Sequence, residues 1–352
     1  MKGGTESPET DRGQDRGQPI GLDIGTSRIV VARGVGRKQT CQAELNAFIT
    51  LPYSELTHSL LNRENVFYDI HGSEFLVFGD DAQKFAEIFH VETRRPMLHG
   101  VLNSNEPHSL MVLSRIIQKL IGRADASNQR ICFSLPAPAM GTEKSVTYHE
   151  LLCRQMLTEL GYDPKPISEG LAVVFGELAS SNYTGIAISC GSGLCNICLA
   201  VLSLPVTAFS IPKAGDFIDS QAALATGELA TRLRVQKERS FQLNGYAADR
   251  VQNVLTVYYE DMIVTLVASL REALSSTLRL PKFDQSIPLV LCGGTAMPKG
   301  FVERFDRTLR NEDFPIQLSE IRLSPDPLTS TARGALVAAL QESPQVKLAA
   351  SA

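Results

Sequence analysis

The sequence of 352 residues has no tryptophan and no run of about 18 uncharged apolar residues. The missing run excludes a membrane-spanning helix, because such a helix needs about 20 mostly apolar residues. The first segment, MKGGTESPETDRGQDRGQ, also lacks an apolar stretch, so it predicts neither a secretory signal nor an amphipathic anchor. We expect residues 1–18 to form a disordered tail and the protein to be cytoplasmic. Membrane association through an apolar loop stays open.

A surplus of positive charge is also missing. The chain has 34 lysines and arginines against 38 aspartates and glutamates, which gives a net charge of −4. Nucleic-acid binding needs a clustered basic surface, so no nucleic-acid partner is expected. The seven cysteines are odd in number and scattered, which predicts reduced thiols. With 43% apolar residues, this length predicts a globular protein of about two domains.

Several catalytic fingerprints are absent from the sequence. It contains no Walker loop, no G-x-G-x-x-G, no H-E-x-x-H and no G-x-S-x-G. The spacing of Cys190, Cys195 and Cys198 could suggest a zinc site, but zinc sites use four ligands and no matching second pair lies nearby. We interpret these cysteines as small buried apolar residues.

Apolar periodicity predicts alternating strands and helices along most of the chain. Strands or strand hairpins are expected at 20–33, 74–79, 130–137, 185–202 and 287–292, and helices at 80–89, 107–121, 145–161, 216–233, 247–278 and 331–340. This alternation is typical of an α/β architecture with two sheets.

The most informative feature is an internal similarity between two hairpins. IGLDIGTS, which begins at Ile20, and IAISCGSG, which begins at Ile186, both read as a strand, a glycine turn and hydroxyl residues. Gly25 aligns with Gly191, about 166 residues later, and this spacing is that of a lobe rather than a solenoid repeat. We therefore predict two lobes that each present a glycine turn to a shared cleft.

Such turns suit phosphate. A tight turn with glycine at its apex directs several backbone N–H groups into one concavity, and the missing Cβ allows phosphate oxygens to approach. Thr26 and Ser27 add hydroxyl donors. Asp23 cannot bind phosphate directly, but it can hold Mg²⁺ through water. A third candidate is the strand end at Gly293 and Gly294, which precedes an expected helix.

Together these segments resemble the actin-like ATPase superfamily, and most of all the bacterial actins of the MreB and MamK kind. The resemblance covers about residues 19–340. Its segments are LDIGTS (22–27), RRPMLHGVL (94–102), ISEGLAVVFG (167–176), ISCGSG (188–193), PKAGDFID (212–219), VQKERSF (235–241), CGGTAMPKG (292–300) and the closing SPDPLTSTARGALVAAL. It implies an α/β fold of two lobes, each a mixed sheet with flanking helices and a smaller inserted subdomain.

The resemblance also implies boundaries. The core of lobe I would comprise 19–38, 93–183 and 325–352, with a small subdomain at 39–92. The core of lobe II would comprise 184–213 and 259–324, with a small subdomain at 214–258.

Carried over to this chain, the resemblance gives roles to matching residues. Asp23 would organise Mg²⁺ through water and Glu169 would orient the attacking water, so these two are the expected catalytic residues. Gly215 and Asp216 would close over the phosphates. Lys237, Glu238, Gly294 and Thr295 would frame the nucleoside. The full set of residues expected to hold ATP is Gly25, Thr26, Ser27, Gly191, Ser192, Gly193, Gly215, Asp216, Lys237, Glu238, Gly293, Gly294 and Thr295.

Three positions depart from the family pattern. Ser189 stands where an Asp is usual, Leu194 where a Thr is usual, and Gly170 where a Pro follows the Glu. A neutral Ser removes one charge near Mg²⁺, so hydrolysis stays open while binding through backbone donors is expected to survive. The expected function is a nucleotide-dependent filament protein that associates with itself, and its adaptor proteins are unknown. The alternatives are a non-hydrolysing nucleotide-binding scaffold and a small-molecule kinase.

Overall fold

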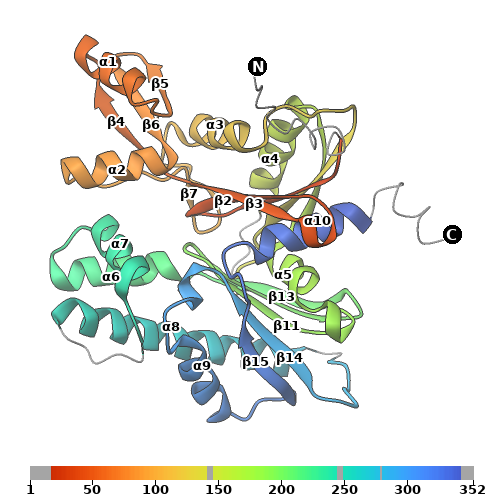
Figure 1. The fold of residues 1–352 in the computed structure, drawn as a ribbon. Coiled ribbons are helices and arrows are strands. Elements are labelled where there is room, and N and C mark those ends of the chain that lie inside the picture. The colour runs from red at the N-terminus through yellow and green to blue at the C-terminus, as the bar shows by residue number, and fades with distance from the viewer. Residues whose placement is uncertain (1–16, 141–145, 244–248, 278–279, 342–352) are drawn as a thin grey trace, which may run out of the picture.

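The computed structural model describes residues 17–140, 146–243, 249–277 and 280–341. Two lobes lie one above the other in Figure 1, with a helix pair between them. Residues 1–16 of the expected tail lie outside the described residues. No helix of the described part is long and apolar enough to cross a membrane.

Lobe I is built on a five-stranded sheet in the order β10-β9-β1-β2-β3. β1 pairs antiparallel with β2 and parallel with β9. Helices α3 and α4 lie on the outer side of this sheet (Figure 1). The bounds are β1 (Ile20–Ile24), β2 (Arg28–Arg33), β3 (Thr40–Leu45), β9 (Gln129–Leu135), β10 (Tyr162–Ser168), α3 (Ser109–Ile121) and α4 (Thr147–Glu159).

A smaller three-stranded sheet projects from lobe I at the upper left of Figure 1. It carries two helices, and a short hairpin follows it in the chain. The bounds are β4 (Phe48–Pro52), α1 (Glu55–Arg63), β5 (Tyr68–His71), β6 (Glu74–Phe78), α2 (Gly79–Phe89), β7 (Met97–Leu98) and β8 (Val101–Leu102). The insertion of a small sheet between β3 and β9 agrees with the predicted lobe architecture.

Lobe II repeats the central arrangement of lobe I. Its sheet has the order β13-β12-β11-β14-β15, and β11 pairs antiparallel with β12 and parallel with β14, as β1 does with β2 and β9. The bounds are β11 (Gly185–Cys190), β12 (Cys195–Val201), β13 (Leu204–Ile211), α6 (Gly215–Thr226), α7 (Ala230–Ser240), α8 (Arg250–Ser276), β14 (Ile287–Cys292), α9 (Phe301–Arg310) and β15 (Leu318–Leu323). Both predicted glycine hairpins are confirmed.

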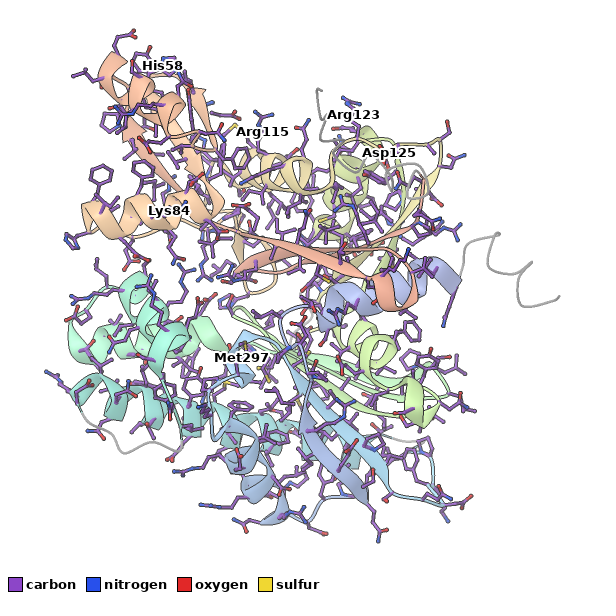
Figure 2. The ribbon with its side chains drawn as sticks, in the orientation of Figure 1. His58, Lys84, Arg115, Arg123, Asp125 and Met297 are labelled. Atoms are coloured by element: carbon purple, nitrogen blue, oxygen red, sulfur yellow. The ribbon has the colours of Figure 1, made fainter. Side chains whose placement is uncertain are left out.

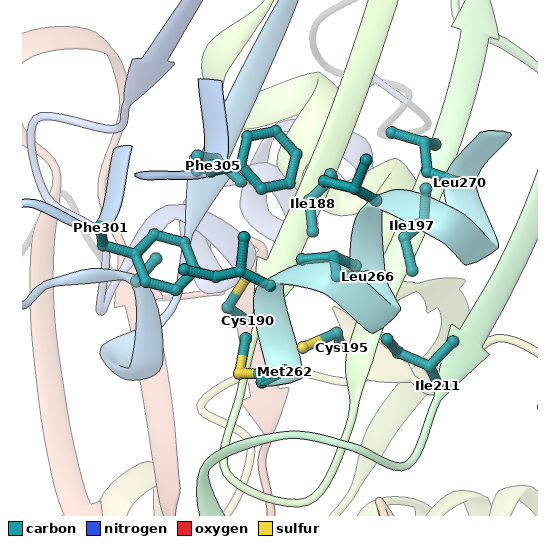
Figure 3. Close-up of a cluster of buried hydrophobic side chains, with 14 of the residues drawn as sticks. Ile188, Cys190, Cys195, Ile197, Ile211, Met262, Leu266, Leu270, Phe301 and Phe305 are labelled. Carbon is teal, nitrogen blue, oxygen red and sulfur yellow. The ribbon is translucent and has the colours of Figure 1, made fainter. Parts of the chain in front are cut away.

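The core of lobe II lies between its sheet and helices α8 and α9. Figure 3 shows Leu266 of α8 and Phe305 of α9 packed against isoleucines of the strands. Cys190 and Cys195 are fully buried in this core as directly opposed residues of β11 and β12. Both thiols are free, and a hydrogen bond with Cys195 together with burial raises the pKa of Cys190. The interpretation of these cysteines as apolar core residues fits this packing.

Two helices between the sheets join the lobes. These are α5 (Glu169–Glu177) and α10 (Ser330–Gln341), and they pack directly on each other. Gly334 of α10 lies so close to the Ala172 carbonyl of α5 that a Cβ there would overlap it. Any larger residue at 334 would force apart the helices that connect the lobes.

One predicted helix is wrong in extent. The expected single helix at 216–233 is two helices, because α6 ends at Gly227 in a left-handed conformation with φ of 81°. The N–H of Gly227 donates to the Ala223 carbonyl at 2.8 Å, which is a glycine helix cap. The break lets α7 turn toward lobe I, where it forms one wall of the site. The strand end at Gly293 leads first into a short 3-10 turn, Gly294–Ala296, and only then into α9.

Candidate functional site

A cavity of about 590 Å³ lies between the lobes. Both glycine hairpins, α5, α7, the 3-10 turn and the start of α10 contribute to its wall. Thirteen of the predicted site residues line it: Asp23, Gly25, Thr26, Ser27, Glu169, Gly191, Ser192, Gly193, Lys237, Glu238, Gly293, Gly294 and Thr295. The structure therefore brings together residues that lie up to 272 positions apart, from Asp23 to Thr295.

The two turns have the same closing hydrogen bond. The N–H of Gly25 donates to the Arg28 carbonyl at 3.0 Å, and the N–H of Gly191 donates to the Leu194 carbonyl at 3.0 Å. The aligned glycines thus occupy equivalent positions, as the internal similarity predicts. Each turn extends beyond its sheet into the cavity between the lobes.

The turns also touch each other. A Cβ on Gly193 would overlap the Thr26 hydroxyl of the opposite lobe. That hydroxyl accepts a hydrogen bond at 3.0 Å from the N–H of Gly100, in the hairpin between β7 and β8, so its own proton is free to be donated. Glycine at 193 is therefore needed for close approach of the two lobes.

Two buried carboxyl groups, those of Asp23 and Glu169, line the cavity and interact electrostatically. Burial raises the pKa of Asp23 to about 6, although a hydrogen bond from the Ser134 hydroxyl at 2.7 Å opposes the rise. Burial and then the charge of Asp23 raise the pKa of Glu169 to about 8, against a hydrogen bond from Asn196 Nδ2 at 2.8 Å. Two like charges at one buried place disfavour each other's ionisation. A bound cation would reverse this and favour both carboxylates.

These two carboxyl groups can bind Mg²⁺ only together with further ligands. Among the described residues no group of three or more His, Cys, Asp or Glu side chains is arranged to hold a metal ion. Mg²⁺ commonly uses one or two carboxylates together with phosphate oxygens and water. Asp23 and Glu169 supply that number of carboxylates beside the two turns, so the residues present fit a phosphate-bound Mg²⁺ and not a site made of protein ligands alone.

Ser189 lines the cavity near this pair but supplies no charge. It lies opposite Asn196 in the β11–β12 pairing, and its side chain makes a hydrogen bond with the thiol of Cys292. The Nδ2 group of Asn196 donates to the Glu169 carboxyl, and the Oδ1 of Asn196 accepts from the N–H of Ala137 at 2.9 Å. Asn196 thus holds the lobe II sheet to Glu169, a role that no sequence motif predicted.

Helix α7 lines the cavity from lobe II. The ammonium of Lys237 lies 2.6 Å from Asp219 of α6 and also donates to the Gly215 carbonyl at 3.3 Å. Glu238 lies 3.8 Å from Arg28, which follows the first turn. These two predicted nucleoside contacts therefore also have protein partners. Asp219, which completes the buried pair with Lys237, was missed, although it lies in the quoted segment 212–219.

Gly215 and Asp216 are the two predicted site residues that are not among the residues lining the cavity. They lie behind the second turn. The N–H of Gly215 donates to the Gly191 carbonyl at 3.2 Å, and that of Asp216 donates to the Ser192 carbonyl at 2.7 Å. The Asp216 carboxylate pairs with Arg95 of lobe I at 2.6 Å. Gly215 and Asp216 occupy this position because they are the first two residues of α6, which begins next to the second turn.

The far end of the cavity is more apolar. Met297 and Leu328 line it, and their side chains are 46% and 41% exposed, which is high for large apolar residues. Figure 2 shows Met297 at the edge of lobe II that faces lobe I. The hydroxyl of Thr295 donates to the Gly191 carbonyl at 2.7 Å, so this residue links the apolar end to the second turn.

Further contacts cross between the lobes at α7. Thr231 donates to the Glu92 carboxylate through both its N–H, at 3.1 Å, and its hydroxyl. Arg234 is buried, lines the cavity and donates to Gln83 of α2 at 3.2 Å. Residues 231, 234 and 238 lie on one stripe of the helix, because they are spaced by three and four. This stripe holds the lobes together at the mouth of the cavity.

Solved structures with the same fold support this arrangement. A MamK double helical filament matches with a TM-score of 0.68 and 21% identity over 93% of this chain and 99% of that one. MreB 5 of Spiroplasma citri bound to AMPPNP matches with 0.62 and 12% over 95% and 98%. The ethanolamine utilization protein EutJ from Carboxydothermus hydrogenoformans matches with 0.51 and 16% over 90% and 88%. The predicted two-lobed actin-like fold is confirmed.

Curated protein sequences give no significant match to this chain. A family model does. The volactin model matches residues 19–339, which is nearly the whole of the described chain and contains both lobes and every residue of the cavity wall. The chain therefore belongs to the volactin family.

Proposed function

We propose that this protein binds ATP with Mg²⁺ in the cavity between its lobes and assembles into cytoskeletal filaments, with slow hydrolysis. The observation that carries the proposal is the pair of opposed glycine turns with two buried carboxyl groups beside them. Backbone N–H groups of both turns would bind phosphate oxygens. Phosphate binding through backbone N–H groups and Mg²⁺ needs no basic surface, so it agrees with the net charge of −4.

The chain's own residues would divide the work by position. The hydroxyls of Thr26 and Ser192 lie on opposite turns, where they can donate to the terminal phosphates. Asp23 would hold Mg²⁺ through water, and the metal would supply charge neutralisation for the phosphates when it is bound. The nucleoside would extend toward Met297 and Leu328, whose exposed apolar surface it would cover.

Hydrolysis would depend mainly on Glu169. Its carboxylate accepts a hydrogen bond from Asn196 and lines the cavity, and it would orient the attacking water molecule. The neutral Ser189 leaves that place with less negative charge than an Asp would supply, so both metal and water are held less firmly. Loss of one group that acts on the transition state costs roughly 10²–10³-fold in rate, which supports slow turnover.

Assembly is the second part of the proposal. The likeness to a MamK double helical filament supports it, and so does a compact two-lobed shape without a further module among the described residues. Subunits that stack head to tail use two different surfaces, and such contacts leave open ends and give filaments. Sedimentation and negative-stain microscopy with ATP at micromolar concentration test this part, and only monomers would refute it.

A second candidate is favoured by Ser189 alone: a scaffold that binds nucleotide without turnover. The decisive experiment measures ATP binding and phosphate release side by side in wild type and Glu169→Ala, with Glu312→Ala as a matched control at a half-exposed ion pair with Arg271. We expect ATP binding in all three and slow phosphate release that only Glu169→Ala abolishes. Binding without release in wild type would select the scaffold, and absence of binding would refute both.

A further inference from the structure

The carbonyl groups of both glycine turns are tied to the protein behind the cavity. In the first turn, the Gly25 carbonyl accepts from Asn46 Nδ2 at 2.9 Å, and the Ser27 carbonyl accepts from the backbone N–H of Asn46 at 2.7 Å. Asn46 lies between β3 and β4, is fully buried and does not line the cavity. A single residue outside the site thus holds two carbonyls of the first turn.

The second turn is held in the same way by different residues. The Gly191 carbonyl accepts from the Thr295 hydroxyl at 2.7 Å, and the Ser192 carbonyl accepts from the N–H of Asp216 at 2.7 Å. The equivalent glycine carbonyls, those of Gly25 and Gly191, therefore each receive a side-chain donor from a distant segment. The similarity of the two turns extends to the way in which they are supported.

A tied carbonyl fixes the direction of the N–H that follows it. The peptide unit is planar and trans, so its C=O and N–H point in opposite directions. A bond that draws the Gly25 carbonyl away from the cavity turns the N–H of Thr26 toward it, and the Gly191 carbonyl does the same for the N–H of Ser192. Within the described chain, neither of these two N–H groups donates a hydrogen bond to the protein.

We propose that Asn46 and Thr295 are positioning residues which orient the backbone N–H groups of the two turns for the phosphates of the nucleotide. This inference rests on the proposed function, because it assigns a purpose to the turn geometry only if the cavity takes a phosphate ligand. The assignment of the Asn46 amide follows from chemistry: the Gly25 carbonyl can only accept, so the NH₂ group of Asn46 must face it.

The orientation of Asn46 also leaves its Oδ1 buried without a hydrogen-bond partner among the described residues. An unsatisfied buried acceptor is unfavourable for folding. Retaining an amide there, with one end unsatisfied, fits a side chain that is selected for what it does to the turn.

The test compares ligands with and without phosphates. Dissociation constants for ATP and for adenosine are measured in the full-length protein for wild type, Asn46→Ala and Thr295→Val, with Asn62→Ala as a control that loses only an exposed hydrogen bond to Tyr68. Thermal unfolding is recorded for each. We expect ATP to bind about tenfold more weakly in Asn46→Ala, as for loss of one oriented donor, while its adenosine affinity changes by less than about twofold. Thr295 lines the cavity and is an expected nucleoside contact, so Thr295→Val is expected to weaken ATP binding by a larger factor than adenosine binding.

If these residues only stabilised the fold, their substitution would weaken the binding of ATP and of adenosine by the same factor. Equal weakening of ATP and adenosine, or unchanged ATP affinity in correctly folded variants, would overturn the inference while leaving the proposed function intact. A wild-type protein that binds neither ligand would overturn the proposed function itself. Should Asn46→Ala fail to fold, the ratio of ATP affinity to adenosine affinity in Thr295→Val decides at the second turn, and a ratio equal to that of the wild type would overturn the inference.

Discussion

The two glycine turns have the same closing hydrogen bond and different electrostatic surroundings. Two residues before its glycine, the first turn has Asp23, which faces the Glu169 carboxyl, whereas the second has Ser189, whose hydroxyl is bonded to the Cys292 thiol. The two carboxyl groups that interact with each other therefore come from the lobe I turn and from α5, while Asp219 and Glu238 line the cavity from α6 and α7. The comparison teaches that the fold gives both lobes a glycine turn with the same closing hydrogen bond, while only the lobe I turn has a carboxyl group two residues before its glycine.

The largest expected effect comes from restoring charge to the second turn. We predict that Ser189→Asp raises the rate of phosphate release by roughly 10²-fold, because it adds a carboxylate where charge develops in the reaction. Phosphate release at saturating ATP and Mg²⁺ measures it, with Ser220→Asp on the exposed face of α6 as a control. A rate that stays at the wild-type level would show that the missing charge is not what limits turnover.

The carboxyl pair also predicts how stability depends on pH. The pKa of Glu169 is raised from 4.5 to about 8 in the folded protein, so between these values the unfolded chain has lost a proton that the folded chain keeps. The free energy of unfolding therefore falls as pH rises through this window, by about 2 kcal/mol after allowance for solvent in the cavity. Glu169→Gln should remove most of this dependence.

Denaturant unfolding at several pH values between 5 and 8.5, in the presence of a chelator, measures this difference. Asp23 contributes a smaller dependence of the same sign below pH 6, because its pKa is raised from 3.8 to about 6. Parallel pH profiles for wild type and Glu169→Gln would contradict the picture of two carboxyl groups that oppose each other's ionisation.

A third prediction concerns the contact between the two turns, at Gly193 and Thr26. Gly193→Ala would place a methyl group against the Thr26 hydroxyl and hold the lobes apart. We expect about tenfold weaker ATP binding, as for the loss of a few hydrogen bonds across the cleft, with little change in thermal stability because each lobe keeps its own core. Isothermal titration calorimetry measures the first and a thermal scan the second. Unchanged affinity would mean that the two turns do not bind one ligand together.

The smallest expected effect concerns the contacts at the cavity mouth. Thr231→Val removes the hydroxyl that bonds Glu92 and leaves the cavity wall untouched. We predict about fivefold faster release of nucleotide, since a part-buried hydrogen bond contributes on the order of 1 kcal/mol to the closed state. Stopped-flow displacement of a fluorescent ATP analogue measures the rate, and a slower release would contradict a clasping role for α7.

The sequence predicted those parts of the site that are local in the chain. Each glycine hairpin contains its own strands, turn and closing bond, so Gly25 and Gly191 could be matched from sequence alone. Asn46, Asn196 and Asp219 could not be assigned roles, because their functions depend on partners from distant segments that only the tertiary fold brings near. The helix end at Gly227 could have been predicted from the sequence, since a glycine after a run of helical residues is a common helix end.

The account's central claim is that one nucleotide is held by both turns at once. A crystal structure with a non-hydrolysable ATP analogue and Mg²⁺ tests it most directly. We predict phosphate oxygens within hydrogen-bond distance of the N–H groups of Thr26 and Ser192, and a metal ion beside Asp23 and Glu169. A nucleotide bound elsewhere, or phosphates that contact only one of the two turns, would contradict the claim.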